Sequence, residues 1–382
     1  MRRICIGFTN IIGYGTSLRD GFREIGEDAR CYIFGNDNYN RGEPDHDILI
    51  DMYNILYCSI QPKVKFRFLK IPFIVLSEAI ILLFYFLAPF RFDVFVFLSE
   101  SKHQRLVLWW IKHFIGRKIF FVFFGSDIRP AKLDGALLNL LPPNEIQGFM
   151  QKQKRLVDSV EKYCDYIISH PPISMFQTRP FFQYIKIGVP TPTQSAAREY
   201  RNDTDVTRIL HAPTSKGAKG SPEIRRLIEK MINNGHKILY LELYGLPHAD
   251  VIREMLLADI VIDQLYTDIP VSGTTLDGCA CGVPVIGGTY YDFGEYNLIP
   301  GVDYPDCILC HPNNLMYELD RMITERNINM AVGLRALEFV STKWNNAAIA
   351  YKYIQILSCR AKQDWIYVPS ENTQIYGCGV KK

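Results

Sequence analysis

The sequence has no marked excess of charge of either sign. Its 382 residues include 43 Lys and Arg against 40 Asp and Glu, a net charge of +3. This balance excludes a protein built around nucleic acid, so no nucleic-acid partner is expected. The two halves nevertheless differ. Residues 1–188 hold 24 basic against 18 acidic side chains, or +6, and residues 189–382 hold 19 against 22, or −3. The first half is therefore expected to face an anionic partner.

The ten cysteines lack the pairing that a disulfide framework or a zinc site requires. Only Cys279 with Cys281 and Cys307 with Cys310 are close in sequence. Neither pair has a second pair at the spacing of a four-ligand zinc site. Buried free thiols in a reducing cytoplasm are therefore expected, and no metal site is predicted.

The sequence also lacks an uninterrupted apolar run long enough to cross a membrane. The apolar part of residues 1–8 is too short for a signal peptide. Residues 73–88 are almost wholly apolar but contain a serine and a glutamate, and a membrane span needs about 20 apolar residues. Residues 63–70, just before, alternate basic and apolar side chains. Two interpretations stay open: a buried helix under a sheet, or an element over 63–89 that docks on an anionic membrane surface.

Strands alternate with helices along the chain in two successive series. Apolar strands such as residues 118–124 have no polar alternation, which is typical of parallel sheets that are buried on both faces. The first series covers 1–190, a polar linker follows at 191–206, and the second series covers 207–343. A helix and tail at 344–382 are expected to return to the first domain. The predicted fold class is α/β, with two doubly wound Rossmann-like domains that face a cleft.

Two local predictions concern the ends of elements. The apolar residues 184–187 are predicted to form the last strand of the first series. Ser221 is predicted to cap the N-terminus of a helix over 221–234, with Pro222 in its first turn.

Two loops in the first half carry candidate ligand contacts. Gly13 and Gly15 follow the first strand, where glycines let a backbone approach a ligand and a helix start favours an anion. Leu18 occupies the place of the third glycine of a full dinucleotide-binding fingerprint. Asp127 and Arg129 follow an apolar strand, at the end where open parallel sheets bind ligands. A local Asp–Arg pair or an Asx turn is the alternative.

Two segments of the second half suit a diphosphate. The loop over 212–220 carries Lys216 and Lys219 among small residues and precedes a helix, so ammonium and amide groups could neutralise phosphates; a solvated basic loop is the alternative. A helix that starts at Gly273 would present amides and threonine hydroxyls to an anion. Asp277, further along that helix, could bond sugar hydroxyls or only improve helix electrostatics.

Together these two segments resemble the donor domain of GT-B-fold glycosyltransferases, especially family 4. The resemblance lies in a basic loop that ends in Lys219-Gly220, a strand over 258–263, and the Gly-x-Pro-Val-Ile sequence at 282–286. Residues 125–129 are similar to an acceptor-domain motif of some relatives. The helix over 345–357 is similar to their closing helix, which crosses back to the first domain.

The resemblance implies transfer of a sugar from a UDP- or GDP-linked donor to a hydroxyl of a glycan or lipid-linked acceptor. It implies retention of anomeric configuration, and the lysines and helix end would make a metal or cofactor unnecessary. The implied donor-binding residues are Gly13, Gly15, Ser215, Lys216, Lys219, Glu242, Leu246, His248, Gly273, Thr274, Thr275 and Asp277. Ser126, Asp127 and Arg129 would bind the acceptor, and Asp127 and Lys219 are the candidate catalytic residues. The expected location is cytoplasmic, peripheral on the inner face of a membrane.

Two other functions stay open. A sugar-nucleotide epimerase of the same fold would need no acceptor, and it would leave the basic apolar segment at 63–89 without a role. A catalytically inactive relative that acts as a binding subunit is the other. A nicotinamide-dependent dehydrogenase is disfavoured by the incomplete glycine fingerprint after the first strand.

Overall fold

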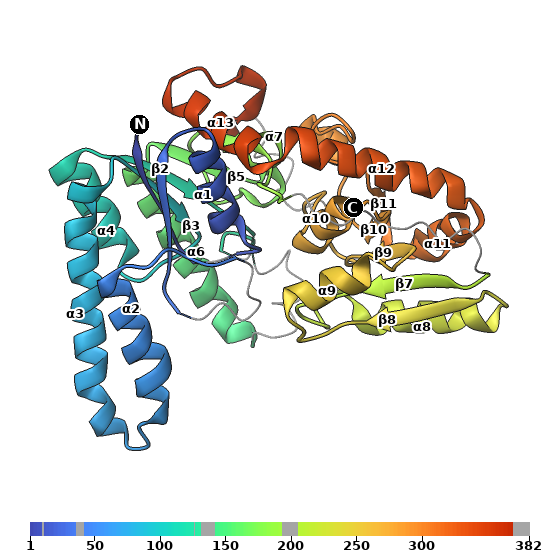
Figure 1. Cartoon of the computed structure of the whole chain (residues 1–382), viewed down its shortest axis with the longest axis horizontal. Helices are drawn as coiled ribbons and strands as arrows, with labels where there is room; N and C mark the ends of the chain where they lie inside the picture. Colours follow the sequence, from blue (N-terminus) through green and yellow to red (C-terminus); the bar gives the residue numbers. More distant parts are fainter. Residues whose placement is uncertain (10, 36–41, 126, 131–141, 193–204, 370–382) are drawn as a thin grey trace. The chain divides into compact units, whose positions relative to one another are not determined.

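The computed structural model describes residues 1–9, 11–35, 42–125, 127–130, 142–192 and 205–369, and the chain divides into two compact units (Figure 1). Unit 1 contains Met1–Pro130, Pro143–Ile187 and the chain from Ile349 onward, and most of unit 2 is Gly188–Ala348. Ser126 and most of the predicted linker 191–206 lie outside the described residues.

Unit 1 is built on a seven-stranded sheet with the order β12-β6-β5-β4-β3-β1-β2. All of its strand pairs are parallel except β12 with β6. The strands are β1 (Arg3–Phe8), β2 (Asp28–Ile33), β3 (Val94–Leu98), β4 (Lys118–Val122), β5 (Tyr166–Ser169), β6 (Phe181–Gln183) and β12 (Ile366–Tyr367). The inner strands β3 and β4 are almost entirely buried and apolar, because helices cover both faces of the sheet.

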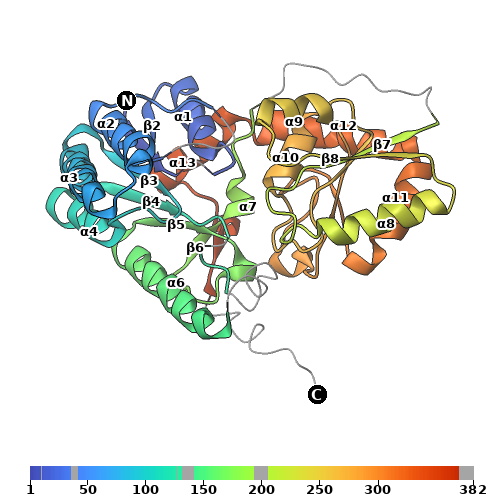
Figure 2. The same cartoon turned by 90° about the horizontal axis from the view of Figure 1, so that it is seen from below.

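Two layers of helices enclose this sheet (Figure 2). One layer contains α1 (Tyr14–Glu24) and α13 (Asn346–Leu357). Tyr353 of α13 packs against Phe120 of β4 and donates or accepts a 2.8 Å hydrogen bond with the hydroxyl of Tyr14. The other layer contains α3 (Arg67–Arg91), α4 (Gln104–Trp110) with a π-helical continuation over Ile111–Ile115, and α6 (Pro143–Tyr163).

The prediction of a strand over residues 184–187 is wrong. This segment is the short helix α7 (Tyr184–Ile187), and β6 immediately before it takes the place in the sheet beside β5. Tyr184, Ile185 and Ile187 are all buried, so their apolar character reflects core packing rather than strand pairing.

The apolar helix predicted over 73–88 is longer than expected and only partly covered. Ile81, Phe84 and Ala88 of α3 are buried in the core of unit 1, whereas Phe68 and Val75 on its outer side are exposed. With α2 (Ile48–Asn54) and the π-helix over Ile55–Ile60, α3 forms a helical hairpin that projects from the sheet (Figure 1). In the part of the chain that the structure describes, α3 is the one helix long and apolar enough to cross a membrane.

Unit 2 is built on a five-stranded parallel sheet with the order β11-β10-β9-β7-β8. Its strands are β7 (Thr207–His211), β8 (Ile238–Glu242), β9 (Ile260–Ile262), β10 (Val285–Gly288) and β11 (Ile308–Cys310). The chain leaves β7 towards β8 and returns on the other side of β7 to form β9. The sheet is therefore doubly wound, and its switch point lies between β7 and β9, where open parallel sheets bind ligands.

Helices cover both faces of this second sheet. The core between the sheet and the helices α8 (Ser221–Asn233) and α11 (Leu315–Thr324) contains Ile224, Ile228 and Leu319. The other helices are α9 (His248–Met255), α10 (Gly273–Ala280) and α12 (Arg326–Lys343). The predicted α/β class with two Rossmann-like units is confirmed.

Candidate functional site

The loop between β7 and α8 meets the carboxyl end of β9 at a buried carboxylate. The Lys219 Nζ lies 3.2 Å from Asp263 Oδ1, and the hydroxyl of Thr275 donates a 3.0 Å hydrogen bond to Asp263 Oδ2. The Asp263 side chain is 3% exposed and that of Lys219 16% exposed. The lysine of the basic loop and the first turn of α10 are therefore brought together at the switch point of unit 2.

The N-terminus of α10 has no side-chain cap. Ser272 occupies the cap position without making the capping hydrogen bond, and among the described residues its Oγ is a buried atom with no hydrogen-bond partner. The first amides of a helix have no partner within the helix, and this end carries the positive end of the helix dipole. Because Thr274 and Thr275 are also buried here, this helix end can bind an anion with little exposure to water.

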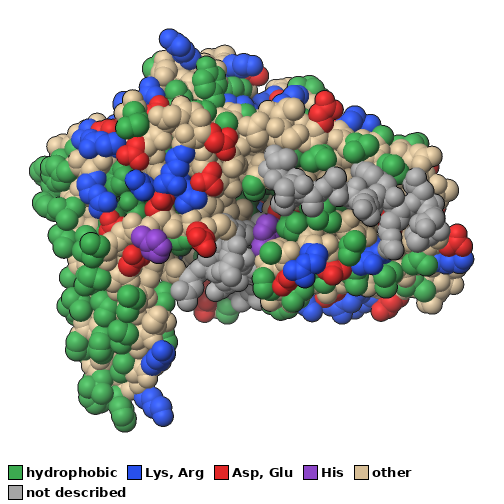
Figure 3. Space-filling view, viewed as in Figure 1, with side chains coloured by type: hydrophobic (Ala, Val, Ile, Leu, Met, Phe, Trp, Pro, Cys, Tyr) green, Lys and Arg blue, Asp and Glu red, His purple; other side chains and the backbone are tan. Residues whose placement is uncertain are grey.

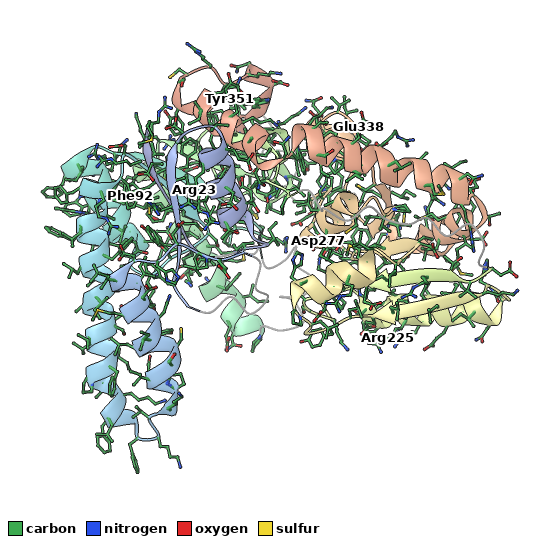
Figure 4. The ribbon with its side chains drawn as sticks, viewed as in Figure 1. Arg23, Phe92, Arg225, Asp277, Glu338 and Tyr351 are labelled. Carbon is green, nitrogen blue, oxygen red and sulfur yellow. The ribbon has the colours of Figure 1, made fainter. Side chains whose placement is uncertain are left out.

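Glu242 at the end of β8 is held by two cations. Lys216 Nζ lies 3.1 Å from one of its oxygens, and Arg225 Nε donates a 2.9 Å hydrogen bond to the other (Arg225 is labelled in Figure 4). Burial alone would raise the pKa of Glu242, but the hydrogen bond from Lys216 and the charge of Arg225 outweigh it and lower the pKa. The Lys216 ammonium also lies 4.9 Å from the ring centre of Tyr244. The basic loop is thus joined to the loop after β8.

His248 and Asp277 connect the starts of α9 and α10. The Nε2 of His248 lies 3.0 Å from Asp277 Oδ1, at ion-pair distance but without hydrogen-bond alignment. Both side chains keep some exposure, and Asp277 lies one turn into α10 (Figure 4). Each therefore remains accessible to a ligand at this edge of the sheet.

The remaining candidates of unit 2 play smaller parts. The Ser215 side chain is exposed, and its carbonyl accepts a 3.0 Å hydrogen bond from Lys219 N, which shapes the basic loop. Leu246 is a half-exposed residue of the loop before α9. The prediction that Ser221 caps α8 is wrong, because Gly220, with φ of 72°, is the cap residue. The Ser221 hydroxyl instead lies 2.8 Å from His211 Nε2, and burial lowers the pKa of that histidine.

Gly13 and Gly15 lie in unit 1 at the start of α1. Gly13 is the N-cap residue, with φ of 74°. A Cβ at Gly15 would come within 2.9 Å of Cys31 Sγ and of Leu98 Cδ1. The close packing of α1 on the sheet therefore requires a glycine at position 15, whether or not a ligand approaches.

The carboxylate of Asp127 accepts hydrogen bonds from backbone amides of its own turn. The carboxylate accepts a 2.9 Å hydrogen bond from Gly125 N and longer bonds from Phe124 N. Both donors precede Asp127, whereas an Asx turn uses the amide two residues after the aspartate. Burial raises the pKa of Asp127, and these amide donors only partly oppose the shift. The guanidinium of Arg129 lies against Gly125, where a Cβ would meet it at 2.9 Å. Ser126, the third acceptor candidate, lies outside the described residues.

Two residues of interest were missed in the sequence analysis. Asp263 had a usable signal, because it is an acid directly after a buried apolar strand. His170 has the same position after β5; it is buried, and its Nε2 has no hydrogen-bond partner among the described residues. Burial and the charge of Arg129 lower the pKa of His170 to about 3. The described residues contain no group of three or more His, Cys, Asp and Glu that could hold a metal ion, and metal independence stays a prediction.

The chain is similar in fold to solved structures of glycosyltransferases. An α-glucosyltransferase in complex with UDP and a 13-mer DNA matches with a TM-score of 0.56 at 12% identity, over 94% of this chain and 100% of that one. This chain has the GT-B fold. Anabaena HepE in complex with UDP and glucose also shares the GT-B fold, with a TM-score of 0.53 at 11% identity over 94% and 99% of the two chains. The lipopolysaccharide outer core galactosyltransferase WaaB matches at 0.52 and 11%, over 94% and 100%.

Sequence comparison adds no relative. No protein-family model matches the chain, and no curated protein matches it significantly. At 11–12% identity the solved structures establish the GT-B fold, and the assignment to family 4 stays a prediction.

Proposed function

We propose that this chain is a glycosyltransferase that moves a sugar from a UDP- or GDP-linked donor to a hydroxyl of a glycan or lipid-linked acceptor. The observation that carries the proposal is the meeting of Lys219 with the uncapped start of α10 at the switch point of unit 2. Two of the solved structures with this fold were determined with UDP bound. Their bound nucleotide supports a nucleoside diphosphate as the anion that unit 2 accepts.

In this proposal the diphosphate lies between Lys219 and α10. An ammonium has three donors, so Lys219 can keep its bond to Asp263 and still donate to a phosphate oxygen. The amides of Gly273, Thr274 and Thr275 supply further donors at the positive end of the helix. Lys216 and Ser215 close the other side of the diphosphate from the basic loop.

The sugar and the nucleoside would occupy the two sides of this anion site. The Asp277 carboxylate and His248 would bond sugar hydroxyls. The ribose and base would lie beside Glu242 and Leu246 at the end of β8. Gly13 and Gly15 of unit 1 stay predicted donor-binding residues.

Transfer would proceed with retention and without a metal or cofactor. The bond between the anomeric carbon and the diphosphate oxygen breaks as the acceptor oxygen binds the same face of that carbon. A leaving phosphate oxygen takes the acceptor proton. Lys219 and the α10 amides stabilise the negative charge that grows on the departing nucleoside diphosphate.

The acceptor would bind in unit 1 near Ser126, Asp127 and Arg129. Because the Asp127 carboxylate bonds the amides of its own turn, we assign it to positioning of the acceptor loop. Arg129 would contact the acceptor directly.

Incubation with UDP-, GDP- and dTDP-sugars tests the proposal. One nucleotide sugar should raise the melting temperature, and it should be hydrolysed slowly in the absence of an acceptor. A nucleoside monophosphate is the matched control, since it lacks the second phosphate, and it should stabilise the protein much less. Equal stabilisation by the monophosphate, or none by any donor, would contradict the donor site. A donor that returns epimerised would instead favour the epimerase.

We also propose that residues 63–89 dock on an anionic membrane surface, so that the protein is peripheral on the inner face of a membrane. Phe68, Val75 and Phe86 on the outer side of α3 are more than half exposed. Hydrophobic side chains follow the length of this side, and basic side chains gather at the free end of the hairpin (Figure 3). The exposed Lys63 and Lys65 lie at that end. An apolar face with basic flanks is the pattern of a helix that lies in the membrane interface.

Vesicle sedimentation tests this membrane proposal. Val75→Glu with Phe86→Glu should abolish partitioning onto vesicles of phosphatidylcholine and phosphatidylglycerol. The control pair Tyr317→Glu and Ile328→Glu changes equally exposed apolar residues of unit 2 and should leave partitioning unchanged. Equal binding of both variants would favour the buried-helix interpretation.

A further inference from the structure

An open groove of about 610 Å³ lies between α4 and α6 on the outer side of unit 1. Its apolar surface comes from Leu106 and Trp109 of α4 and from Leu156 and Tyr163 of α6. The volume is within the range of small-molecule sites. Neither the donor site of unit 2 nor the Asp127 loop contributes to its lining, so it is separate from the sites described above.

One end of the groove is cationic. Arg105 and Arg155 both line it and are exposed, and neither has a carboxylate partner among the residues that the structure describes. Lys152 lies nearby but is paired with Glu100 at 2.9 Å. A guanidinium presents its N–H groups in a planar fork that matches phosphate oxygens. Two unpaired guanidinium groups above an apolar floor therefore fit a ligand with a phosphate head and an apolar body.

A buried donor in the same groove is also unpaired. Gln104 is 6% exposed, and its Oε1 accepts a 2.9 Å hydrogen bond from Ser101 N. Its Nε2 is buried without a partner in the described part of the chain. A buried donor without an acceptor is unfavourable, and an oxygen of a bound ligand would satisfy it.

The two ends of the groove differ in their position relative to the sheet. The Lys152–Glu100 pair marks the end next to the carboxyl end of β3, and Tyr163, whose ring lies 5.6 Å from that of His113, marks the other end. The cationic end thus lies at the sheet edge where ligands of open parallel sheets bind. The same edge carries the loop of Asp127.

The apolar face of α3 continues towards the groove. The indole of Trp110 on α4 stacks on Phe86 of α3 at 4.9 Å, and the exposed Leu106 and Phe114 extend the apolar surface along α4 and its continuation. The exposed apolar surface of α3 therefore continues over α4 to Leu106, which lines the groove.

We propose that the α4–α6 groove binds a long-chain lipid phosphate, with the phosphate between Arg105 and Arg155 and the chain along Trp109 and Tyr163. The inference rests on the proposed function and deepens it, because it names the acceptor as a sugar carried on such a lipid. A bare membrane surface would not require a groove, and free phosphate would not require an apolar floor.

Binding of hexadecyl phosphate to the full chain, below the concentration at which it forms micelles, tests the inference. Tryptophan emission should change on binding because Trp109 lines the groove. Hexadecanol and inorganic phosphate each supply half of the ligand and should bind at least tenfold more weakly. Equal binding of either one would overturn the inference.

Paired charge variants locate the site. Arg105→Gln with Arg155→Gln should raise the Kd for hexadecyl phosphate at least tenfold. Arg226→Gln with Lys230→Gln removes the same charge from exposed positions of α8 and should leave the Kd unchanged. Equal weakening by both pairs would mean unspecific attraction and would refute the groove.

The same samples separate this inference from the proposed function. Both pairs of variants should keep the full thermal stabilisation by the nucleotide sugar, which also shows that they are folded. Nucleotide-sugar binding without hexadecyl phosphate binding would overturn the groove alone. Hexadecyl phosphate binding without any nucleotide-sugar binding would overturn the proposed function alone.

Discussion

Replacement of Lys219 by alanine tests the donor site most directly, because it should change two quantities that can be measured separately: the Kd for the nucleotide sugar and the free energy of unfolding. The ammonium lies 3.2 Å from Asp263 Oδ1, and that carboxylate is 3% exposed. After the replacement, the hydroxyl of Thr275 remains as a donor to Asp263 Oδ2. The variant therefore loses a cation for the diphosphate and also leaves a carboxylate buried without its ion-pair partner.

The two losses have different magnitudes. Removal of one partner from a buried ion pair destabilises a protein by about 3–5 kcal/mol. Because the Lys219 side chain keeps 16% exposure, we expect the lower end, about 3 kcal/mol. A lost hydrogen bond to a charged group weakens binding by about 1.5–3 kcal/mol, which corresponds to a 10- to 150-fold higher Kd for the nucleotide sugar.

The double variant Lys219→Ala with Asp263→Asn separates these effects. The amide of asparagine carries no charge, so urea unfolding should recover a large part of the lost stability. The Kd for the nucleotide sugar, measured by calorimetry, should stay high because the ammonium is still absent. If Lys219→Ala leaves that Kd unchanged while the protein remains folded, Lys219 does not bind the donor and the site is wrong.

Three further variants test individual features. Gly220→Ala should lower the free energy of unfolding by about 2–4 kcal/mol, since φ is 72° and the new Cβ would lie 2.7 Å from Leu265; Gly217→Ala, in open space of the same loop, should change it by less than about 0.5 kcal/mol. The pKa of His170 is lowered to about 3, so as the pH falls below about 6.5 the unfolded state takes up the proton first and stability falls by about 1.4 kcal/mol per pH unit. His170→Leu should remove this slope from urea titrations between pH 7.5 and 5, and a persistent slope would assign it to other groups. Asp277→Asn should lower kcat/KM about 10- to 150-fold with little change in nucleoside diphosphate affinity; a matching loss of diphosphate affinity would contradict its contact with the sugar.

The basic loop shows which features can be predicted from residues that are neighbours in the sequence. The apolar strand, the two lysines and the helix start are consecutive in sequence, so their order alone predicts a cationic loop at a sheet edge. The charge partners are not local. Lys216 pairs with Glu242, and Lys219 pairs with Asp263, and each partner lies at the carboxyl end of a different strand. The cations are therefore predictable from local sequence, whereas their pairing with Glu242 and Asp263 is not.

Asp127 and Gly15 are two residues whose roles could not be decided from the sequence pattern. Both residue types suit ligand contact, but each of these two residues also has a structural role that its neighbours require. Asp127 bonds the amides of its own turn, and Gly15 admits the side chains of Cys31 and Leu98. Residue type and spacing fit a ligand-binding role and a structural role equally well. The contacts that distinguish these roles come from separate strands for Gly15 and from the geometry of the turn for Asp127.

The order of apolar and polar residues determined by itself the two strand–helix series, the basic loop before α8 and the long apolar helix, since each depends on neighbours in the chain. Tertiary structure decided which faces became core. Ile81 of α3 is buried by the sheet while Val75 is left exposed, and the groove with Arg105 and Arg155 forms only because α4 and α6 pack side by side. Burial depends on which elements pack against one another in space. When two helices are separated in sequence by a strand and a loop, the residues of each helix do not indicate that the two will pack together.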